Sequence, residues 1–422
     1  MKLFGATEEM ANAFQQNYCV SRDLGCDIIQ NGIIPPLSEV KRTDPIKPPF
    51  YYGGIYNLDG VVSETSLLNR SWGQIVSAYP ETDMAALEPT RHHESVVYGG
   101  LILRHFGHFL VESTTRLWWP ILNGFDGPIV FHSEVPNPLS IHFVREFFDL
   151  LGITERVIVI DKALSFDTIY VPEPAFQIQT YAHPLYLLPF KAIIQGPEFK
   201  SLQLMPKKLY LSRTRLGTGL AAGEEFIEEI MKSNGFAIIH PERLSLLEQI
   251  KYVYSAETIC GVVGSAFHLL LFTERKQTVC INRIGWLNPN YIIVDQLTKS
   301  KPVYIWAHKY HAKDVSNSKY VNLLNIDFIV ECLRKLGFAV NLPDNYSDNL
   351  LERQYLSAWH LADYWYTRDK ENPDKQLNSL LLAKLLNPQS GAVDWYLQKE
   401  MKSRKLDPEW VAIHDSENMN GI

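Results

Sequence analysis

The chain reads Thr258-Ile259-Cys260-Gly261-Val262-Val263-Gly264-Ser265-Ala266-Phe267-His268 at the point that decides its fold. An uncharged, apolar run of strand length ends in a glycine–serine pair, and a second apolar segment follows at once. This order predicts a buried strand over 258–263, a tight turn, and a helix over 266–272.

The same alternation continues on both sides of that stretch. Apolar runs of four to six residues predict strands over 208–212, 236–240, 277–282 and 303–306. Amphipathic segments predict helices over 224–233 and 245–255, the second with Ser245 as N-cap and Glu248 completing a capping box. Strands that alternate with helices in this way indicate a parallel, doubly wound α/β sheet.

The remaining chain divides into three further parts. Residues 1–46 predict an irregular segment, and residues 47–205 a first α/β unit with strands over 127–132, 157–160 and 168–171 and a helix over 140–151. Residues 206–342 form the regular unit described above. Residues 343–422 predict a helical extension, with helices over 351–367, 376–386 and 395–401 that cover a domain face or make an interface.

Composition narrows the class of protein. The chain has 422 residues, of which 46% are hydrophobic and 21% charged, as expected for a soluble globular protein. A net charge of −7 without a basic tract argues against nucleic acid as a partner. The five cysteines form no metal-type pair and suit a reducing compartment. The first 13 residues predict no signal peptide, so we expect a cytoplasmic protein.

Phosphate-binding features follow two predicted strands. Gly264 permits close approach to the backbone, and the amides of Ser265 and Ala266 open a helix, an arrangement that favours anions. Arg213 and Arg215 follow the strand over 208–212 at the same sheet edge, where a guanidinium can neutralise a diphosphate. The alternatives are a glycine needed only for packing and arginines that are only solvated.

Acid–base residues gather near position 108. On a helix starting near Gly107, His108, Glu112 and Arg116 fall at i, i+4 and i+8, with an apolar stripe opposite. Such a helix is expected to line a cleft. Two alternatives stay open: a pair that only braces the helix, and a metal site formed by His105, His108 and Glu112. The chain contains no D-x-D, the commonest carrier of a divalent cation on a nucleotide sugar.

Three segments in this order resemble glycosyltransferase family 61: 105–112 with 116–118, 209–215, and 236–249 with 261–266. The resemblance implies a GT-B architecture, two Rossmann-like domains facing across a cleft, and an inverting transfer without an essential metal. It implies no cofactor; the nucleotide sugar, expected to be UDP-linked, is a co-substrate.

An inverting transfer needs a base, which we assign to the His108–Glu112 pair: Glu112 alone could act, or His108 could act with Glu112 orienting it. His105 would also be catalytic, and Arg104 and Arg116 would contact the acceptor. The nucleotide would be bound in the C-terminal domain by Ser212, Arg213, Arg215, His240, Pro241, Glu242, Gly264, Ser265, Ala266 and His268.

Two departures from the family pattern qualify this interpretation. Val263 stands where the family usually has a histidine, so His268 is a candidate replacement, and the helical extension lies outside the resemblance. The resemblance suggests a bacterial cytoplasmic member that builds a capsule, lipopolysaccharide or similar surface glycan on a glycan or lipid-linked acceptor. Peripheral contact with the inner membrane face and homo-oligomerisation through the C-terminal helices stay open. The rival functions are a non-catalytic nucleotide-sugar or glycan binding protein and a metal-dependent hydrolase.

Overall fold

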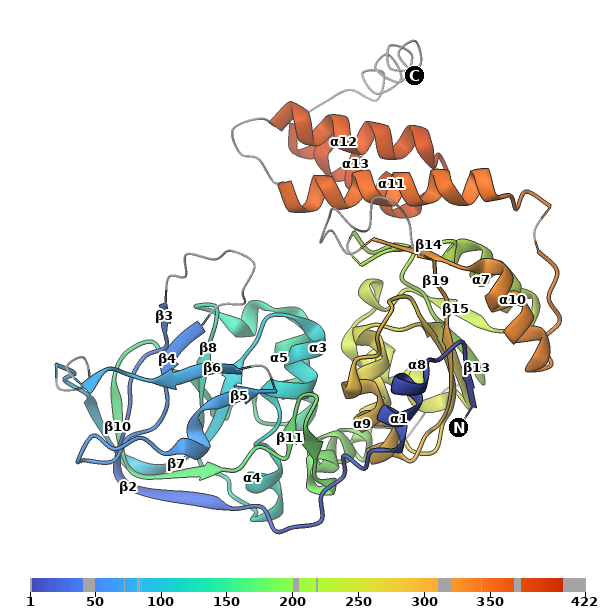
Figure 1. Ribbon diagram of the computed structural model, residues 1–422. Coiled ribbons are helices and arrows are strands. Elements are labelled where there is room, and N and C mark those ends of the chain that lie inside the picture. Colours follow the sequence, from blue (N-terminus) through green and yellow to red (C-terminus); the bar gives the residue numbers. More distant parts are fainter. Residues whose placement is uncertain are drawn as a thin grey trace.

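The computed structural model describes residues 2–40, 50–71, 73–81, 84, 86–199, 205–217, 219–309, 321–342, 344–367 and 373–404. The protein is a mixed α/β molecule with several sheets and many helices (Figure 1). Within the described residues, no helix has the length and apolarity needed to cross a membrane.

The C-terminal sheet has six parallel strands in the order β1-β18-β17-β16-β13-β15. Their bounds are β1 Lys2–Phe4, β13 Lys208–Leu211, β15 Ala237–Ile239, β16 Thr258–Val262, β17 Gln277–Asn282 and β18 Lys301–Trp306. The chain runs from β13 outward to β15 and then returns across β13 to β16. The strand order therefore reverses between β13 and β16, and ligands of open α/β sheets bind at such a reversal.

Helices cover both faces of this sheet. On one face lie α8 (Leu246–Ser255), the 3₁₀ helix η8 (Ser265–Phe272) and α9 (Pro289–Thr298), within an apolar core that continues into the N-terminal half. On the other face lie α7 (Glu224–Ser233) and α10 (Ile326–Lys335). The capping box of α8 is confirmed, because Ser245 Oγ accepts from Glu248 N and the Glu248 side chain accepts from Ser245 N. The helix expected over 266–272 is a 3₁₀ helix.

The first residues belong to this C-terminal sheet. β1 pairs with β18, and α1 (Glu8–Gln15) places Phe14 against Tyr304 and Trp306 (Figure 1, dark blue). The chain then crosses to the other half as β2 (Cys26–Ile34) and β3 (Ser38–Val40). This order differs from the irregular segment expected over 1–46, of which residues 41–46 lie outside the described residues.

The N-terminal sheet has the order β2-β10-β7-β8-β9, with β2 antiparallel to its neighbour and the other strands parallel. Its remaining strands are β7 Thr90–Ile102, β8 Ile129–Ser133, β9 Val157–Val159 and β10 Leu164–Pro172. The helix α5 (His142–Leu151) ends at the residue that the sequence predicted, and Gly152 follows it in the left-handed conformation. A smaller sheet, β3-β4-β6-β5, adds β4 Phe50–Gly53, β5 Leu68–Arg70 and β6 Gly73–Ala78.

Short elements connect these layers. The helices among them are η1 Glu64–Ser66, η3 Pro138–Ser140, η4 Thr154–Arg156, η5 Pro184–Leu187, α6 Leu188–Ile194, η6 Pro197–Phe199 and η7 Pro241–Arg243. The strands are β11 Phe176–Gln177, β12 Tyr181–Ala182, β14 Ala221–Ala222, β19 His308–Lys309 and β20 Asn322–Leu324. β11 and β12 form a hairpin, and β14, β20 and β19 form a small sheet.

The C-terminal extension is helical, as expected. It contains α11 (Asp348–Thr367), α12 (Pro373–Leu386) and α13 (Gly391–Arg404), and residues 405–422 lie outside the described residues. Leu351, Tyr355, Leu380 and Val393 are buried in the same core as α7 and α10. The extension therefore covers that face of the C-terminal half (Figure 1).

Candidate active site

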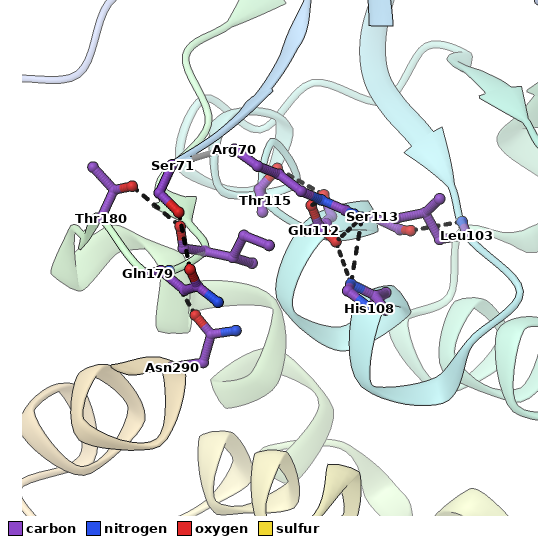
Figure 2. A network of polar contacts seen from close by, with 11 residues as sticks. Arg70, Ser71, Leu103, His108, Glu112, Ser113, Thr115, Gln179, Thr180 and Asn290 are labelled. Atoms are coloured by element: carbon purple, nitrogen blue, oxygen red, sulfur yellow. Dashed lines mark hydrogen bonds and ion pairs between the residues drawn. The ribbon is translucent and has the colours of Figure 1, made fainter. Parts of the chain in front are cut away.

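A buried ion pair stands at the centre of the site. Glu112 is 5% exposed, and Arg70 of β5 grips its carboxylate from two sides, with Nε 2.7 Å from Oε1 and Nη2 2.8 Å from Oε2. His108 Nδ1 lies 2.5 Å from Oε2 (Figure 2). A carboxylate only accepts hydrogen bonds, so His108 donates from Nδ1, and in the neutral ring Nε2 is the proton acceptor.

The environment keeps Glu112 ionised. Burial alone would raise the pKa of this carboxyl group, but the hydrogen bond from His108 and the charge of Arg70 outweigh burial and lower the pKa. The His108 side chain is 40% exposed, whereas that of Glu112 is 3% exposed. His108 is therefore the member of the pair that a substrate can reach.

The backbone in this segment is not the regular helix that the sequence predicted. A single turn, α3 (Phe106–His108), leads into a π-helix, η2 (Phe109–Ser113), and α4 (Trp118–Leu122) begins only after a turn. A π-turn holds one more residue than an α-turn, and such turns are frequent at functional sites. His108 and Glu112 still meet, but the stripe does not extend to Arg116.

Arg116 points into the protein interior. It is 3% exposed and donates to the carbonyl oxygens of Pro172 and Thr65, with its guanidinium 5.4 Å from the ring centre of Tyr98. Arg104, by contrast, lies at the surface. Its side chain is 74% exposed, and its Nε lies 3.8 Å from Glu134 Oε1. The structure therefore brings neither expected acceptor residue to the His108–Glu112 pair.

On the C-terminal side, Arg213 follows β13 and lies against the turn after β16. A Cβ atom added to Gly264 would stand 1.9 Å from Arg213 Nη1, so a side chain at this position would displace the guanidinium from the turn. Arg213 Nη2 donates to the carbonyl of Gly219 at 3.1 Å. Arg283, which follows β17, adds a second guanidinium beside Gly219 and donates from Nε to Val263 O at 3.4 Å.

His268 lies beside the same turn. Its ring stacks on Tyr291 of α9 at 5.3 Å, and it is 6% exposed. Neither ring nitrogen has a hydrogen-bond partner among the described residues. Burial, together with the charges of His108 and His105, lowers the pKa of His268 to about 3, so the ring is neutral and can donate one hydrogen bond and accept another.

The two groups of residues meet at Gly107. A Cβ atom there would stand 2.8 Å from Ser265 Oγ and 3.2 Å from His268 Nδ1. Gly107 lies between His105 and His108, whose rings are 5.2 Å apart. The segment that carries the acid–base pair therefore lies directly against the glycine–serine turn.

Much of this region is similar in sequence to a known protein family. The family model described as Glycosyltransferase 61 matches residues 106–281, from α3 to β17. This region matches glycosyltransferase family 61. The match supports a glycosyltransferase. No curated protein matches the chain.

The family 61 region contains His108, Glu112, Arg213 and the turn at Gly264, but not His105, Arg70 or Arg283. His105 is exposed, yet loss of surrounding water and the charges of His108 and Arg213 lower its pKa to about 4. Among the described residues, no group of three or more histidine, cysteine or carboxylate side chains is arranged to hold a metal ion.

The other nucleotide-binding candidates lie around the end of β15 and β13. Ser212 Oγ turns toward Glu228 and Thr214. Arg215 is exposed and lies near Gly391 of α13. The pKa of His240 is lowered to about 4 by burial and by the charges of Arg215 and Arg243.

Two further nucleotide-binding candidates, Pro241 and Glu242, follow His240 at the end of β15. Pro241 is buried at the start of η7, whereas the Glu242 side chain is partly exposed. Burial raises the pKa of Glu242, whose Oε1 lies 3.9 Å from Arg243 Nε. Ala266 is partly buried in η8.

A polar link crosses between the two halves next to Arg70. Ser71 Oγ donates to Gln179 Oε1 at 2.9 Å, and Gln179 N donates to Asn290 Oδ1 at 2.7 Å (Figure 2). Gln179 has a φ of 59°, a left-handed conformation uncommon outside glycine. The link joins the strand end that carries Arg70 to the start of α9, which carries Tyr291.

Proposed function

We propose that the protein is an inverting, metal-independent glycosyltransferase of GT-B type that takes a sugar from a nucleotide sugar, expected to be UDP-linked. The observation that carries this proposal is the contact at Gly107, where a proton acceptor meets a cationic, glycine-rich turn. Inverting transfer needs both within reach of one anomeric carbon.

The proposed reaction is a single in-line displacement. His108 Nε2 takes the proton of the acceptor hydroxyl, and the acceptor oxygen forms a bond to the anomeric carbon. The bond from that carbon to the diphosphate oxygen breaks on the opposite face, and its electron pair leaves with the diphosphate. Glu112 stabilises the imidazolium that forms, in the way that a buried carboxylate supports a histidine base.

The leaving diphosphate would be held by Arg213, Arg283 and the backbone amides of Ser265 and Ala266. Preorganised cations and amides that face developing negative charge supply much of the catalytic effect in such sites. His240, Pro241 and Glu242 at the end of β15 would contact the nucleoside. The family usually has a histidine where this chain has Val263. His268, whose ring nitrogens have no hydrogen-bond partner among the described residues, would take over the role of that histidine.

The acceptor is expected to be a glycan or a lipid-linked sugar of a bacterial surface polysaccharide. We expect the protein to work in the cytoplasm, at the inner face of the membrane, and α11–α13 to be available for self-association. A non-catalytic binding protein would also need the cationic turn to bind phosphate. It would not need a proton acceptor such as His108, which a buried carboxylate holds in place. Turnover of nucleotide sugars separates these two functions.

The test compares His108→Gln and Glu112→Gln with His93→Gln, a control whose side chain is 80% exposed on β7. With a panel of nucleotide sugars and glycoside acceptors, we expect His108→Gln to lower kcat by about 10²-fold or more. Glu112→Gln should also lower kcat, because the amide can donate to Nδ1 and leave Nε2 protonated. Donor affinity should stay unchanged, because the pair acts on the acceptor hydroxyl.

Two results would contradict the assignment of His108 as base, and a third would contradict the transferase proposal. If His108→Gln keeps turnover within a few-fold while Glu112→Gln is inactive, Glu112 is the base. If both variants turn over normally and only melt at a lower temperature, the pair merely braces the segment. If the unaltered protein turns over no nucleotide sugar and transfers to no acceptor, the transferase proposal fails.

A further inference from the structure

A cavity of about 250 Å³ opens beside Glu112, between η1, β5 and the β11–β12 hairpin. Its lining includes Glu112 and Thr115, Asn69 and Glu64, and Gln177 and Tyr181. The cavity is smaller than the roughly 300–1,000 Å³ of sites that take drug-sized ligands. Its size suits one ring rather than an extended chain.

The polar side chains of this cavity fall into two groups. Thr115 Oγ1 donates to Glu112 O at 3.0 Å, and Tyr181 Oη donates to Pro174 O at 2.9 Å, so both have partners. The side chains of Asn69, Gln177 and Glu64 make no hydrogen bond to any described residue. Two amides and a carboxylate are therefore available to donate to and accept from a ligand with several hydroxyl groups.

Apart from Thr65 and Glu173, the remaining lining is apolar. Leu67, Phe176 and Ile178 are 5%, 2% and 4% exposed, so they form a fixed surface rather than mobile side chains. A sugar ring combines a C–H face with a rim of hydroxyl groups. An apolar surface bordered by amides matches both parts.

The charges of the cavity exclude one class of sugar. Its lining contains three glutamates and no lysine, arginine or histidine, and the two glutamates that are paired use cations outside the lining: Arg70 for Glu112 and Arg22 for Glu173. A ligand that carried a carboxylate or phosphate would meet negative charge without a compensating cation in the wall. The cavity therefore favours an uncharged ligand.

We infer that this cavity binds one neutral sugar ring of the acceptor, with Asn69 and Gln177 hydrogen-bonded to its hydroxyl groups. The inference rests on the proposed glycosyltransferase function and specifies its acceptor as a neutral glycan terminus rather than an acidic sugar or a bare lipid phosphate. Glu112 joins the cavity to the base, because its carboxylate holds His108 and its residue forms the wall. Sites built to hydrogen-bond hydroxyl groups reject analogues that lack them.

The experiment uses methyl glycosides of neutral hexoses, N-acetylhexosamines and hexuronic acids, with binding followed by ligand-observed NMR. The variant is Asn69→Leu/Gln177→Leu, which keeps side-chain size and removes the hydrogen bonds. Gln30→Leu, an exposed amide on β2, is the matched control. Far-ultraviolet circular dichroism and melting temperature show that each variant is folded.

We expect at least one neutral glycoside to bind the unaltered protein and the Gln30→Leu control equally, and to bind the double variant at least tenfold more weakly. Hexuronic glycosides should bind none of the three. Neutral glycosides that bind the double variant as well as the control, or that bind no protein, would overturn the inference. So would preferred binding of hexuronic glycosides.

Nucleoside diphosphate affinity is measured on the same samples. If it is intact while glycoside binding fails the test, the acceptor inference is wrong and the proposed transferase is untouched. If the unaltered protein binds neither a nucleoside diphosphate nor turns over a nucleotide sugar, the proposed function itself fails.

Discussion

Among single residues, Arg70 determines what Glu112 can do. A carboxyl group 3% exposed would be costly to ionise by itself, and the two-pronged contact from Arg70 offsets that cost. The charged Glu112 then fixes the His108 ring and its protonated nitrogen. Arg70 touches no reacting atom in this scheme, so it is a positioning residue.

We predict that Arg70→Lys lowers kcat by about tenfold or more, because an ammonium group cannot reproduce the two parallel hydrogen bonds that the planar guanidinium donates to Glu112. Arg70→Gln should have the larger effect and should raise the pKa of Glu112. Its turnover should therefore fall first on the acid side of the pH–rate profile, with Arg70→Lys intermediate. A loss that is uniform from pH 5.5 to pH 8.5 in both variants would show that Arg70 acts only on stability.

The sequence predicted some residues of the site, missed others and misplaced one. His108 and Glu112 lie four positions apart, so local spacing was enough to pair them. Arg70 lies 42 positions before Glu112 in a short strand without a clear pattern, and nothing in the chain links it to the pair. Arg283 follows a predicted strand at the same edge as Arg213, so the rule that found Arg213 would have found Arg283. Arg116 was misplaced because a π-turn leaves no signature in residue spacing.

Among elements, the ends of β13 and β16 act together. Arg213 extends from one strand end, and Gly264 at the other supplies the space that its guanidinium occupies. Neither strand end alone would fix a cation at the point where the strand order reverses.

We predict that Arg213→Ala and Gly264→Ala both weaken nucleoside diphosphate binding by about tenfold or more, because charge-assisted hydrogen bonds to phosphate contribute roughly 1.5–3 kcal/mol each. Binding of the free nucleoside should change little. Calorimetry measures both affinities, with Arg145→Ala on the exposed side of α5 as the control. Equal losses for nucleoside and diphosphate would show that this turn does not bind phosphate.

The sequence predicted the C-terminal elements better than the N-terminal ones. α7 was expected over 224–233 and has those bounds, because buried parallel strands and amphipathic helices leave strong periodic patterns. β7 begins Thr90-Arg91-His92-His93-Glu94, whose polar side chains gave no strand signal. Its exposed first half gains its strand geometry from pairing with β10, which local sequence does not encode.

For the molecule as a whole, buried histidines link stability to pH. His132 is fully buried, with Nδ1 2.9 Å from Tyr98 Oη and Nε2 2.8 Å from Pro35 O, and burial lowers its pKa to about 4. The unfolded chain, with a histidine pKa of about 6.5, binds more protons between these values. The contribution of His132 to stability is therefore present above pH 6.5 and is lost as pH falls toward 4.

We predict that the free energy of unfolding of the native protein falls, relative to that of His132→Gln, by up to about 1.4 kcal/mol for each pH unit between pH 6.5 and pH 4. Glutamine can donate to Pro35 O and accept from Tyr98 while staying neutral. The comparison is necessary because burial raises the pKa of Glu224 to about 8 and of Asp295 to about 7, which acts in the opposite sense. Urea unfolding at pH 7, 6 and 5 measures the difference, and a pH-independent difference would contradict the prediction.

The strand β1 has a consequence for the order in which the protein is made. Its partner β18 begins about 300 positions later in the chain, and a ribosome adding roughly 5–20 residues per second delivers that partner about 15–60 s after β1 has emerged. During this interval Leu3 and Phe4 lack the neighbour that covers them in the finished molecule. β1 is thus synthesised long before the strand that it pairs with, and deleting it would leave the edge of β18 open to strands of other chains.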